Sequence, residues 1–342
     1  MSSQPEQVPV GVAFTPFEGR LEVIDQVTAH AERHGLDFVS VAEAMSLAAP
    51  IVLARLAERT RRIGLRTGVL SVWSRTPATL AMTAAELQRQ SSGRFVLGLG
   101  ASTPPVTEGF HGQPWQAPVE RVRQTCTAVR ALLDGRRLPG PPDGARPLPL
   151  GSPPETRVPL ALAAVTPAGI RLAGRLADQW LPFLVPVSAL DDGREIMASE
   201  SGTSRASPPT VTMAVPVALA ADEETAAATA ARWLVTYATR MGPVYPRVLR
   251  AHGYRRELDA LLEANVDPRQ QVLPAGATRL AEDVLMFGTY ADAPRVLRHW
   301  STRADTVALV APFGVGADDI VATLDAVGST DRQESGQDPG GC

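Results

Sequence analysis

The chain has 342 residues, of which 44% are hydrophobic and 20% charged, and its 36 acidic and 33 basic side chains leave a formal net charge of -3. This balance excludes a protein that binds nucleic acid or an anionic membrane through its overall charge. All basic residues are arginine, so a Schiff-base lysine and the lysine of a phosphate-binding loop are both excluded.

Apolar runs alternate along the chain with helical patterns, and their near-continuous hydrophobicity is typical of strands that are covered on both faces. In chain order, the predicted strands are 8–14, 38–43, 63–71, 94–100, 158–164, 179–185, 210–220 and 306–312. The helical patterns that follow them are 21–35, 49–61, 77–90, 119–134, 167–177, 188–200, a long region 222–303 that is divided into several helices, and 316–327.

Eight units of a strand followed by a helix favour a TIM-like (β/α)8 barrel over an open doubly wound sheet, which usually has about six strands. We therefore predict a single α/β barrel domain over 1–327, with insertions after the fourth strand and before the eighth. The segment 328–342 is predicted to be a disordered tail. In such a barrel the site lies where strands end and helices begin.

The cysteines and the first residues of the chain indicate the cellular compartment of the protein. Cys126 lies within a helical pattern and Cys342 is the last residue, so a disulfide framework and a multi-cysteine metal site are excluded. The start, MSSQPEQVPV, has no basic flank followed by an apolar core, and no run approaches the roughly 20 apolar residues of a membrane span. We expect a cytoplasmic protein.

Residues 94–102, RFVLGLGAS, end a predicted strand in glycines. A dinucleotide-binding fingerprint does not fit, because Pro104 and Pro105 are expected to prevent an immediate helix and no acidic residue follows about 20 positions later in a second strand. The segment is then either a turn whose N–H groups hold an anion or a tight barrel turn.

Two predicted helices begin with a threonine and a proline. Thr76 and Thr166 are predicted N-caps, with Pro77 and Pro167 at the first helical position. Each helix start is either an anion site or a plain cap. Gly68, inside a strand, marks a bulge, a close approach by something flat, or barrel curvature.

Two longer stretches carry a family resemblance: 67–102, TGVLSVWSRTPATLAMTAAELQRQSSGRFVLGLGAS, and 158–180, VPLALAAVTPAGIRLAGRLADQW. On these residues the chain resembles the bacterial luciferase-like superfamily of flavin- and deazaflavin F420-dependent oxidoreductases, most closely its actinobacterial F420-dependent branch. The resemblance runs over 8–185 and returns at 254–262 and 285–312.

This resemblance implies a TIM-like barrel with the ring of F420, or of FMN as the alternative, at the carboxyl ends of the strands. It implies a non-prolyl cis peptide bond between Gly68 and Val69 that supports the ring. The backbone expected to hold the phosphate-bearing tail belongs to Gly100, Ala101, Ser102, Ala163, Ala164, Val165 and Thr166.

The chain departs from the resemblance at acid–base positions. Many F420-dependent relatives have an acidic residue followed by histidine after the second strand, where this chain has Glu43 and Ala44. Thr103 stands where the sugar-phosphate dehydrogenases have a glutamate, and it is a candidate catalytic residue. Because the family's sugar-phosphate lysines are also missing, we reject a sugar-phosphate substrate. Glu43 itself is either a general acid or the partner of a neighbouring arginine.

Four further residues are candidates for the substrate pocket. Trp73 is expected to stack on the substrate or the ring, and Trp180 to do so or to pack in the core. Arg75 is expected to bind an anionic group or to form a surface ion pair, and His111 to fold over the substrate or to face solvent.

The other histidines fall within helical patterns: His30, His34, His252 and His299. We interpret them as solvated or capping residues, judge that no pair has metal-ligand spacing, and expect no metal site.

Three hypotheses for the function remain. The first is hydride transfer between F420 and a small organic substrate with a C=C, C=N or carbonyl/alcohol group. The second is an FMNH2-dependent monooxygenase that uses O2 and a partner flavin reductase. The third is a flavin-binding protein without catalysis. The resemblance further implies a homodimer.

Overall fold

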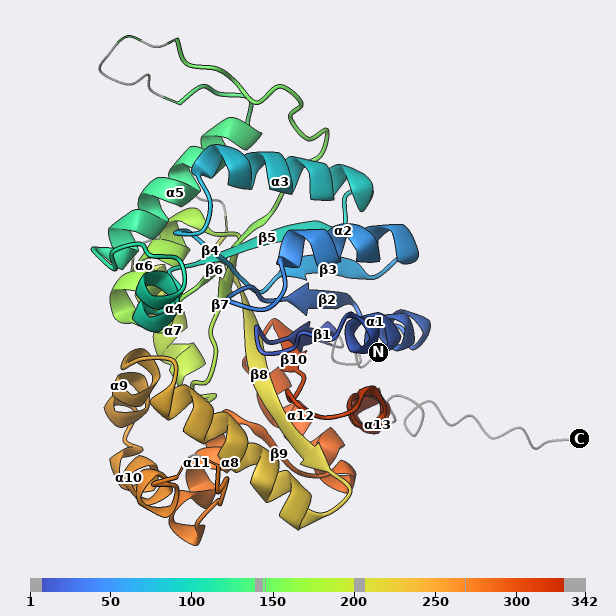
Figure 1. Cartoon of the computed structure of the whole chain (residues 1–342), viewed down its shortest axis with the longest axis vertical. Coiled ribbons are helices and arrows are strands. Elements are labelled where there is room, and N and C mark those ends of the chain that lie inside the picture. Colours follow the sequence, from blue (N-terminus) through green and yellow to red (C-terminus); the bar gives the residue numbers. More distant parts are fainter. Residues whose placement is uncertain (1–7, 139–143, 145, 200–206, 268, 329–342) are drawn as a thin grey trace, which may run out of the picture.

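The protein is represented by a computed structural model, which describes residues 8–138, 144, 146–199, 207–267 and 269–328. A closed barrel of parallel strands lies at its centre and helices surround it (Figure 1). The strands of the barrel follow one another in the order β10-β1-β2-β3-β5-β6-β7-β8, and pairing of β10 with β8 closes the ring. The predicted TIM-like architecture is therefore confirmed.

The barrel strands agree with the apolar runs of the sequence. They are β1 (Val10–Phe14), β2 (Phe38–Val41), β3 (Gly64–Thr67), β4 (Leu70–Ser71), β5 (Phe95–Gly100), β6 (Leu160–Ala163), β7 (Gln179–Leu181), β8 (Thr210–Ala220) and β10 (Thr306–Val310). The predicted third strand is divided into β3 and β4 by a cis peptide bond between Gly68 and Val69, as the resemblance implied.

The helices that cover the barrel begin and end within two residues of the predicted bounds. They are α1 (Leu21–Arg33), α2 (Ala49–Arg59), α3 (Pro77–Gln90), α5 (Pro118–Leu133), α6 (Pro167–Leu176), α7 (Ala189–Ala198) and α13 (Ala317–Gly328). Their apolar residues recur at helical spacing, so one face of each helix packs on the sheet. In α1, for example, Val23, Val27 and Ala31 are buried.

One helix was excluded by the sequence argument and is present. The short helix α4 (Pro104–Gly109) begins directly after the glycine-rich turn, so the expectation that Pro104 and Pro105 prevent an immediate helix is wrong. The prolines occupy the first helical turn, where the backbone N–H groups have no partner inside the helix, and proline therefore loses nothing there.

The long insertion before the last barrel strand also differs from the prediction. It contains the expected helices and the unexpected strand β9, which pairs with the second half of β8 through Val217 and Met286. This strand has only four residues and borders a helix, so its sequence lacks an alternating pattern. In chain order, the insertion consists of α8 (Glu223–Thr239), α9 (Val244–Ala251), α10 (Arg255–Ala264), η2 (Ala275–Ala277), α11 (Thr278–Val284), β9 (Met286–Thr289), η3 (Tyr290–Asp292) and α12 (Ala293–Ser301).

Two further points concern the predicted disordered tail and membrane-spanning helices. The tail predicted to be disordered falls, apart from Gly328, outside the described residues. Among the helices that the structure describes, none combines the length and the apolar character needed to cross a bilayer.

Candidate active-site cavity

A cavity of about 460 Å³ opens at the carboxyl ends of the barrel strands and continues into the barrel. All the residues expected to contact the cofactor line it. They are Gly68, Val69, Gly100, Ala101, Ser102, Ala163, Ala164, Val165 and Thr166. Glu43 and Thr103 line it as well, so residues from β2, β3, β5 and β6 meet at one opening.

The glycines of β5 have a structural cause that the sequence did not reveal. A Cβ atom on Gly98 would lie 2.0 Å from the carbonyl oxygen of Thr67, and one on Gly100 would lie 2.8 Å from a methyl group of Val69. These glycines are therefore required by the neighbouring strand, whatever occupies the cavity. Gly68 is less strictly constrained, because its Cβ would meet Oγ of Ser40 at 2.2 Å, a side-chain atom that can rotate away.

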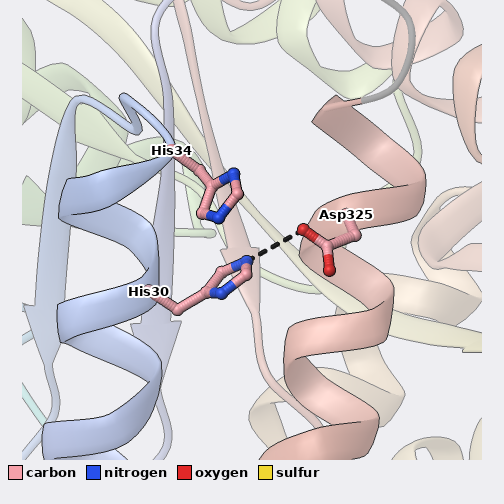
Figure 2. Close-up of side chains that lie close together, drawn as sticks. All are labelled: His30, His34 and Asp325. Atoms are coloured by element: carbon pink, nitrogen blue, oxygen red, sulfur yellow. Dashed lines mark hydrogen bonds and ion pairs between the residues drawn. The ribbon is translucent and has the colours of Figure 1, made fainter.

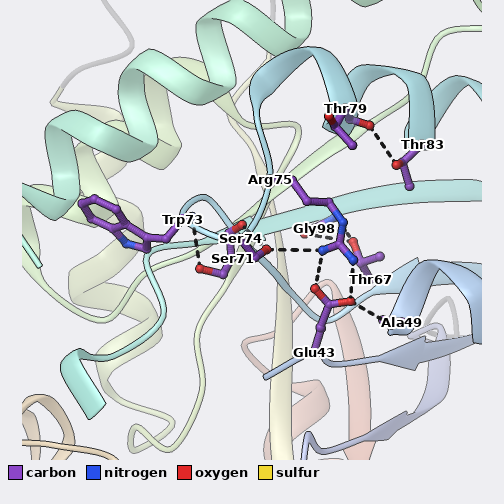
Figure 3. A network of polar contacts seen from close by, with 10 residues as sticks. All are labelled: Glu43, Ala49, Thr67, Ser71, Trp73, Ser74, Arg75, Thr79, Thr83 and Gly98. Carbon is purple, nitrogen blue, oxygen red and sulfur yellow. Dashed lines mark hydrogen bonds and ion pairs between the residues drawn. The ribbon is translucent and has the colours of Figure 1, made fainter. Parts of the chain in front are cut away.

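Glu43 and Arg75 form an ion pair beside the cavity (Figure 3). The guanidinium of Arg75 donates to both carboxylate oxygens of Glu43, and its Nη2 lies 2.9 Å from Oε2. Oε2 also accepts a hydrogen bond of 3.0 Å from the backbone N–H of Ala49, at the start of α2. The backbone N–H of Glu43 donates to the carbonyl oxygen of Val69, 3.3 Å away.

Of the two roles considered for Glu43, the structure shows the ion pair. Both carboxylate oxygens of Glu43 are engaged by the guanidinium of Arg75, so the contacts give the general-acid role no support. Glu43 instead connects β2, α2, α3 and the β3–β4 junction. We call Glu43, Arg75, residues 67–71 and residues 98–102 the hydrogen-bonded wall of the cavity.

Trp73 and Trp180 lie behind the cavity lining and do not form part of it. The indole N–H of Trp73 donates to the carbonyl oxygen of Ala101, and that of Trp180 donates to the carbonyl oxygen of Ala164, both at 2.8 Å. The ring of Trp180 is only 1% exposed. Each tryptophan thus fixes one of the two backbone segments expected to hold the cofactor tail. Trp180 packs in the core, which was one of its two expected roles, and Trp73 does not reach the cavity where it was expected to stack.

The two other pocket candidates are also outside the lining. Arg75 is occupied by Glu43, and His111 packs edge-on against Phe110. Trp115, from the segment after α4, does line the cavity and lies 5.9 Å from Trp73, measured between ring centroids.

Thr103 has an unusual environment. Its side chain is buried at the cavity, and its Oγ1 has no hydrogen-bond partner among the described residues. An unpaired buried hydroxyl is destabilising unless a ligand or a water molecule satisfies it. Ser102, just before it, has a left-handed backbone with φ of 63°, which turns the chain from β5 into α4.

Both predicted N-caps are confirmed. The side chain of Thr76 accepts the N–H of Thr79 at 3.2 Å, and that of Thr166 accepts the N–H of Gly169 at 3.4 Å. Only Thr166 lines the cavity, so the start of α6 faces the opening and that of α3 does not.

The opposite side of the cavity is aromatic, and sequence analysis did not identify it. Phe183, Tyr237 and Tyr245 pack with ring centroids 4.9 to 5.8 Å apart, and we call these three residues the aromatic wall. Burial raises the pKa of both tyrosines, so their hydroxyls stay protonated. Neither hydroxyl has a hydrogen-bond partner among the described residues. These tyrosines lie in the insertion, which had no strand-end pattern to mark them.

The floor of the cavity, inside the barrel, is polar. Arg66 projects there from β3, and its guanidinium carbon lies 3.6 Å from the ring centroid of Phe38. Gln179 and Thr212 line the floor with it. An arginine in the middle of the apolar run IGLRTGVL was the signal that could have identified this floor.

The comparisons with known proteins agree with this geometry. The model of the luciferase-like monooxygenase family matches residues 8–302. The chain belongs to this family. A Mycobacterium tuberculosis protein, provisionally named a coenzyme F420-dependent oxidoreductase, is 28% identical over 316 residues, which is 83% of this chain and 89% of that protein.

One further relative in sequence and one similar solved structure were found. The 4-hydroxyprotoasukamycin monooxygenase of Streptomyces nodosus subsp. asukaensis is 33% identical over 42% of this chain and 41% of its own length. The structure of an F420-dependent secondary alcohol dehydrogenase in complex with an F420-acetone adduct superposes with a TM-score of 0.73, covering 94% of this chain and 99% of that one, at 19% identity. The predicted superfamily and its oxidoreductase character are thereby confirmed.

A cluster of two histidines and one aspartate lies outside the active-site cavity, between the first and last helices of the described chain (Figure 2). His30 and His34 stack on α1 with ring centroids 4.1 Å apart, and Nε2 of His30 lies 2.9 Å from Oδ1 of Asp325 on α13. The statement that no histidine pair has metal-ligand spacing is therefore wrong, because residues four apart share one face of a helix. The His30–Asp325 contact ties α1 to α13.

Proposed function

We propose that this luciferase-like protein transfers hydride between F420 and a small organic substrate that carries a C=C, C=N or carbonyl/alcohol group. The observation that carries the proposal is the cavity at the carboxyl ends of the strands, which is lined by every backbone position expected to hold the cofactor. The 28% identical mycobacterial relative, named for F420, supports the choice of cofactor.

The lining fits a ring with a phosphate-bearing tail. Residues 100–102 and 163–166 present alanines, a glycine and backbone N–H groups in place of cationic side chains, and the first turn of α6 faces the same opening. The hydroxyl of Thr103 is buried without a partner and is available to a ligand. In this proposal Val69 contacts the ring, and F420 supplies the hydride chemistry when bound.

The residues of the chain then have separate tasks. Glu43 and Arg75 position the β3–β4 junction against the ring and do not move protons. Tyr237 and Tyr245, which keep their protons because burial raises their pKa, donate a hydrogen bond or a proton to the substrate atom that gains negative charge. Trp115, from the segment after α4, contributes to the exclusion of water.

The second candidate function is a monooxygenase that uses FMNH2 and O2 with a partner flavin reductase. The 33% identity with the Streptomyces monooxygenase favours it, although the matched region is less than half of each chain.

Titrating the purified full chain with F420 and with FMN, followed by turnover with reduced cofactor, tests the proposal. We expect micromolar binding of F420, much weaker binding of FMN, and oxidation of F420H2 that depends on an added enone, imine or ketone and proceeds without O2. Consumption of O2 with FMNH2 and no binding of F420 would establish the second candidate instead.

The Tyr245→Phe variant tests the proton-donor role. Removing one hydroxyl that stabilises developing charge is expected to lower kcat by about 10- to 100-fold while F420 affinity stays unchanged. Equal turnover in Tyr245→Phe, in Tyr237→Phe and in the double variant would exclude both tyrosines. The homodimer remains a prediction that light scattering tests.

A further inference from the structure

The barrel interior of this protein is hollow where TIM-like barrels are usually filled. Bulky branched side chains normally close the interior in layers. Here one position that lines the cavity on each of four strands is an alanine: Ala13, Ala161, Ala214 and Ala308. The cavity therefore continues below the mouth as a channel into the barrel, lined in part by these alanines.

Arg66 lies at the end of this channel. Its neighbour on β3, Leu65, is fully buried and does not line the cavity, whereas Arg66 does, so the pleat directs Arg66 into the barrel. Its guanidinium stacks on Phe38 and is thereby held in one orientation.

The charge of Arg66 is not neutralised by the protein. Among the residues that the structure describes, no carboxylate lies within ion-pair distance of the guanidinium. Its only hydrogen bond within this described set is a long one of 3.5 Å to Oε1 of Gln179. The carboxylate of Asp37 acts on it at longer range and accepts the backbone N–H of Val10 at the amino ends of the strands.

A desolvated guanidinium without an anionic partner destabilises the folded protein. Burial lowers the pKa of Arg66 to about 10, which still leaves it charged at neutral pH. A desolvated cation is stabilised by an anion that reaches it, and most of its five N–H donors are free to bind one.

We propose that the alanine-lined channel is an acid-binding subsite in which Arg66 holds the carboxylate of a small organic acid. The planar fork of a guanidinium matches a carboxylate through two parallel hydrogen bonds. The Oε1 atom of Gln179, already near the guanidinium, orients the fork, and the alanines contact a slender aliphatic chain. The identification of this acid as the substrate rests on the proposed function. If its carboxylate binds Arg66, its reacting carbon lies toward the mouth of the cavity, where the proposed function places the ring.

Calorimetric titration of the full chain with butyrate and with butyramide, in the absence of any cofactor, tests the subsite. Butyrate is expected to bind at least about 10-fold more tightly than butyramide, since hydrogen bonds to a charged group contribute more than neutral ones. Equal binding of the acid and the amide overturns the proposal.

The variant Arg66→Met removes the charge and keeps the volume. It is expected to lower butyrate affinity at least about 10-fold and to change butyramide affinity by less than about 2-fold. The matched control is Arg247→Met, which removes an exposed arginine that lines the mouth of the same cavity. If Arg247→Met loses butyrate binding and Arg66→Met does not, the acid binds at the mouth and the inference fails.

Two further measurements keep the test decisive. If thermal melts show that the Arg66→Met variant is unfolded, Arg66→Gln is used in its place. The comparison of butyrate with butyramide in the wild-type protein requires no variant. The titration is then repeated with saturating F420. If butyrate affinity is undiminished, the acid that binds Arg66 can be the substrate. If F420 and butyrate compete, an acidic group of the cofactor itself binds Arg66, and the proposal that a substrate acid binds there is overturned. Acid binding without F420 binding would leave the subsite standing and refute the proposed function.

Discussion

The two walls of the cavity differ in what their polar groups do. In the hydrogen-bonded wall, the carboxylate of Glu43, the guanidinium of Arg75 and the hydroxyl of Thr67 all bind other parts of the protein. In the aromatic wall, the hydroxyls of Tyr237 and Tyr245 have no partner among the described residues. The first wall therefore fixes geometry, and the second offers groups that a ligand can use.

This difference reverses the assignment that the sequence suggested. A carboxylate at the end of a strand was the obvious proton donor, but its position between α2 and α3 also makes it the natural partner of Arg75. The tyrosines were inconspicuous because they lie on α8 and α9, in the insertion that forms the opposite side of the opening. Four predictions test how far this division holds.

The largest effect is expected from Gly98→Ala in the hydrogen-bonded wall. The added Cβ would lie 2.0 Å from the carbonyl oxygen of Thr67, which cannot withdraw without breaking the pairing of the strands. We expect the free energy of unfolding in urea to fall by about 3 kcal/mol or more. Gly109→Ala is the control, because it is exposed and its Cβ meets nothing within 4 Å, and it should change stability by less than about 0.5 kcal/mol.

The next effect concerns the ion pair. Glu43→Gln should destabilise the protein by about 2 kcal/mol, less than a fully buried pair would lose, because Arg75 is 20% exposed. Arg75→Met should cost a similar amount, and the double variant should show a coupling energy of about 1 kcal/mol or more. The double-mutant cycle is measured by urea unfolding of the wild type, the two single variants and the double variant. Additive losses would mean that the two side chains do not act as a pair.

The aromatic wall is tested by alkaline pH. Below pH 10 the tyrosines hold their protons in both the folded and the unfolded protein, so they add no pH dependence. Above pH 10 they ionise in the unfolded chain, while burial raises the pKa of Tyr237 and Tyr245 in the folded protein. Stability should then fall with rising pH, by up to about 1.4 kcal/mol per pH unit for each tyrosine.

Near-ultraviolet absorbance of tyrosinate follows this directly. The pKa of all four tyrosines is raised in the folded state, that of Tyr254 to about 12, so each should ionise at a higher pH in the native protein than in the urea-unfolded protein. Ionisation of Tyr237 and Tyr245 at the ordinary pH in the native protein would show that the aromatic wall is hydrated.

The smallest effect separates capping from ligand binding. Thr76→Ala and Thr166→Ala should each lower stability by about 1 kcal/mol, since each removes one N-cap. Only Thr166 lines the cavity, so only Thr166→Ala should also weaken the binding of F420, by severalfold. Equal affinities in the two variants would show that α6 begins as a plain cap.

The sequence by itself determined the barrel and the place of its site. Eight apolar runs, each followed by a helical pattern, indicated the barrel and the carboxyl-terminal rim where its site lies, because period and length are local properties of the chain. The residues 100–103 and 163–166, which the family resemblance assigned to the site, lie at the ends of two predicted strands and do line the cavity. The N-caps at Thr76 and Thr166 were equally local.

Only the tertiary structure decided which side chains face the cavity and which hold it together. Trp73 was expected to stack on a ligand and Trp180 to stack or to pack in the core, and the two donate to the backbone carbonyls of Ala101 and Ala164. The reason for Gly98 lies in Thr67, thirty-one residues earlier, and the partner of Glu43 is thirty-two residues later. Contacts of this kind depend on strand register and on the closure of the barrel, and no local pattern records them.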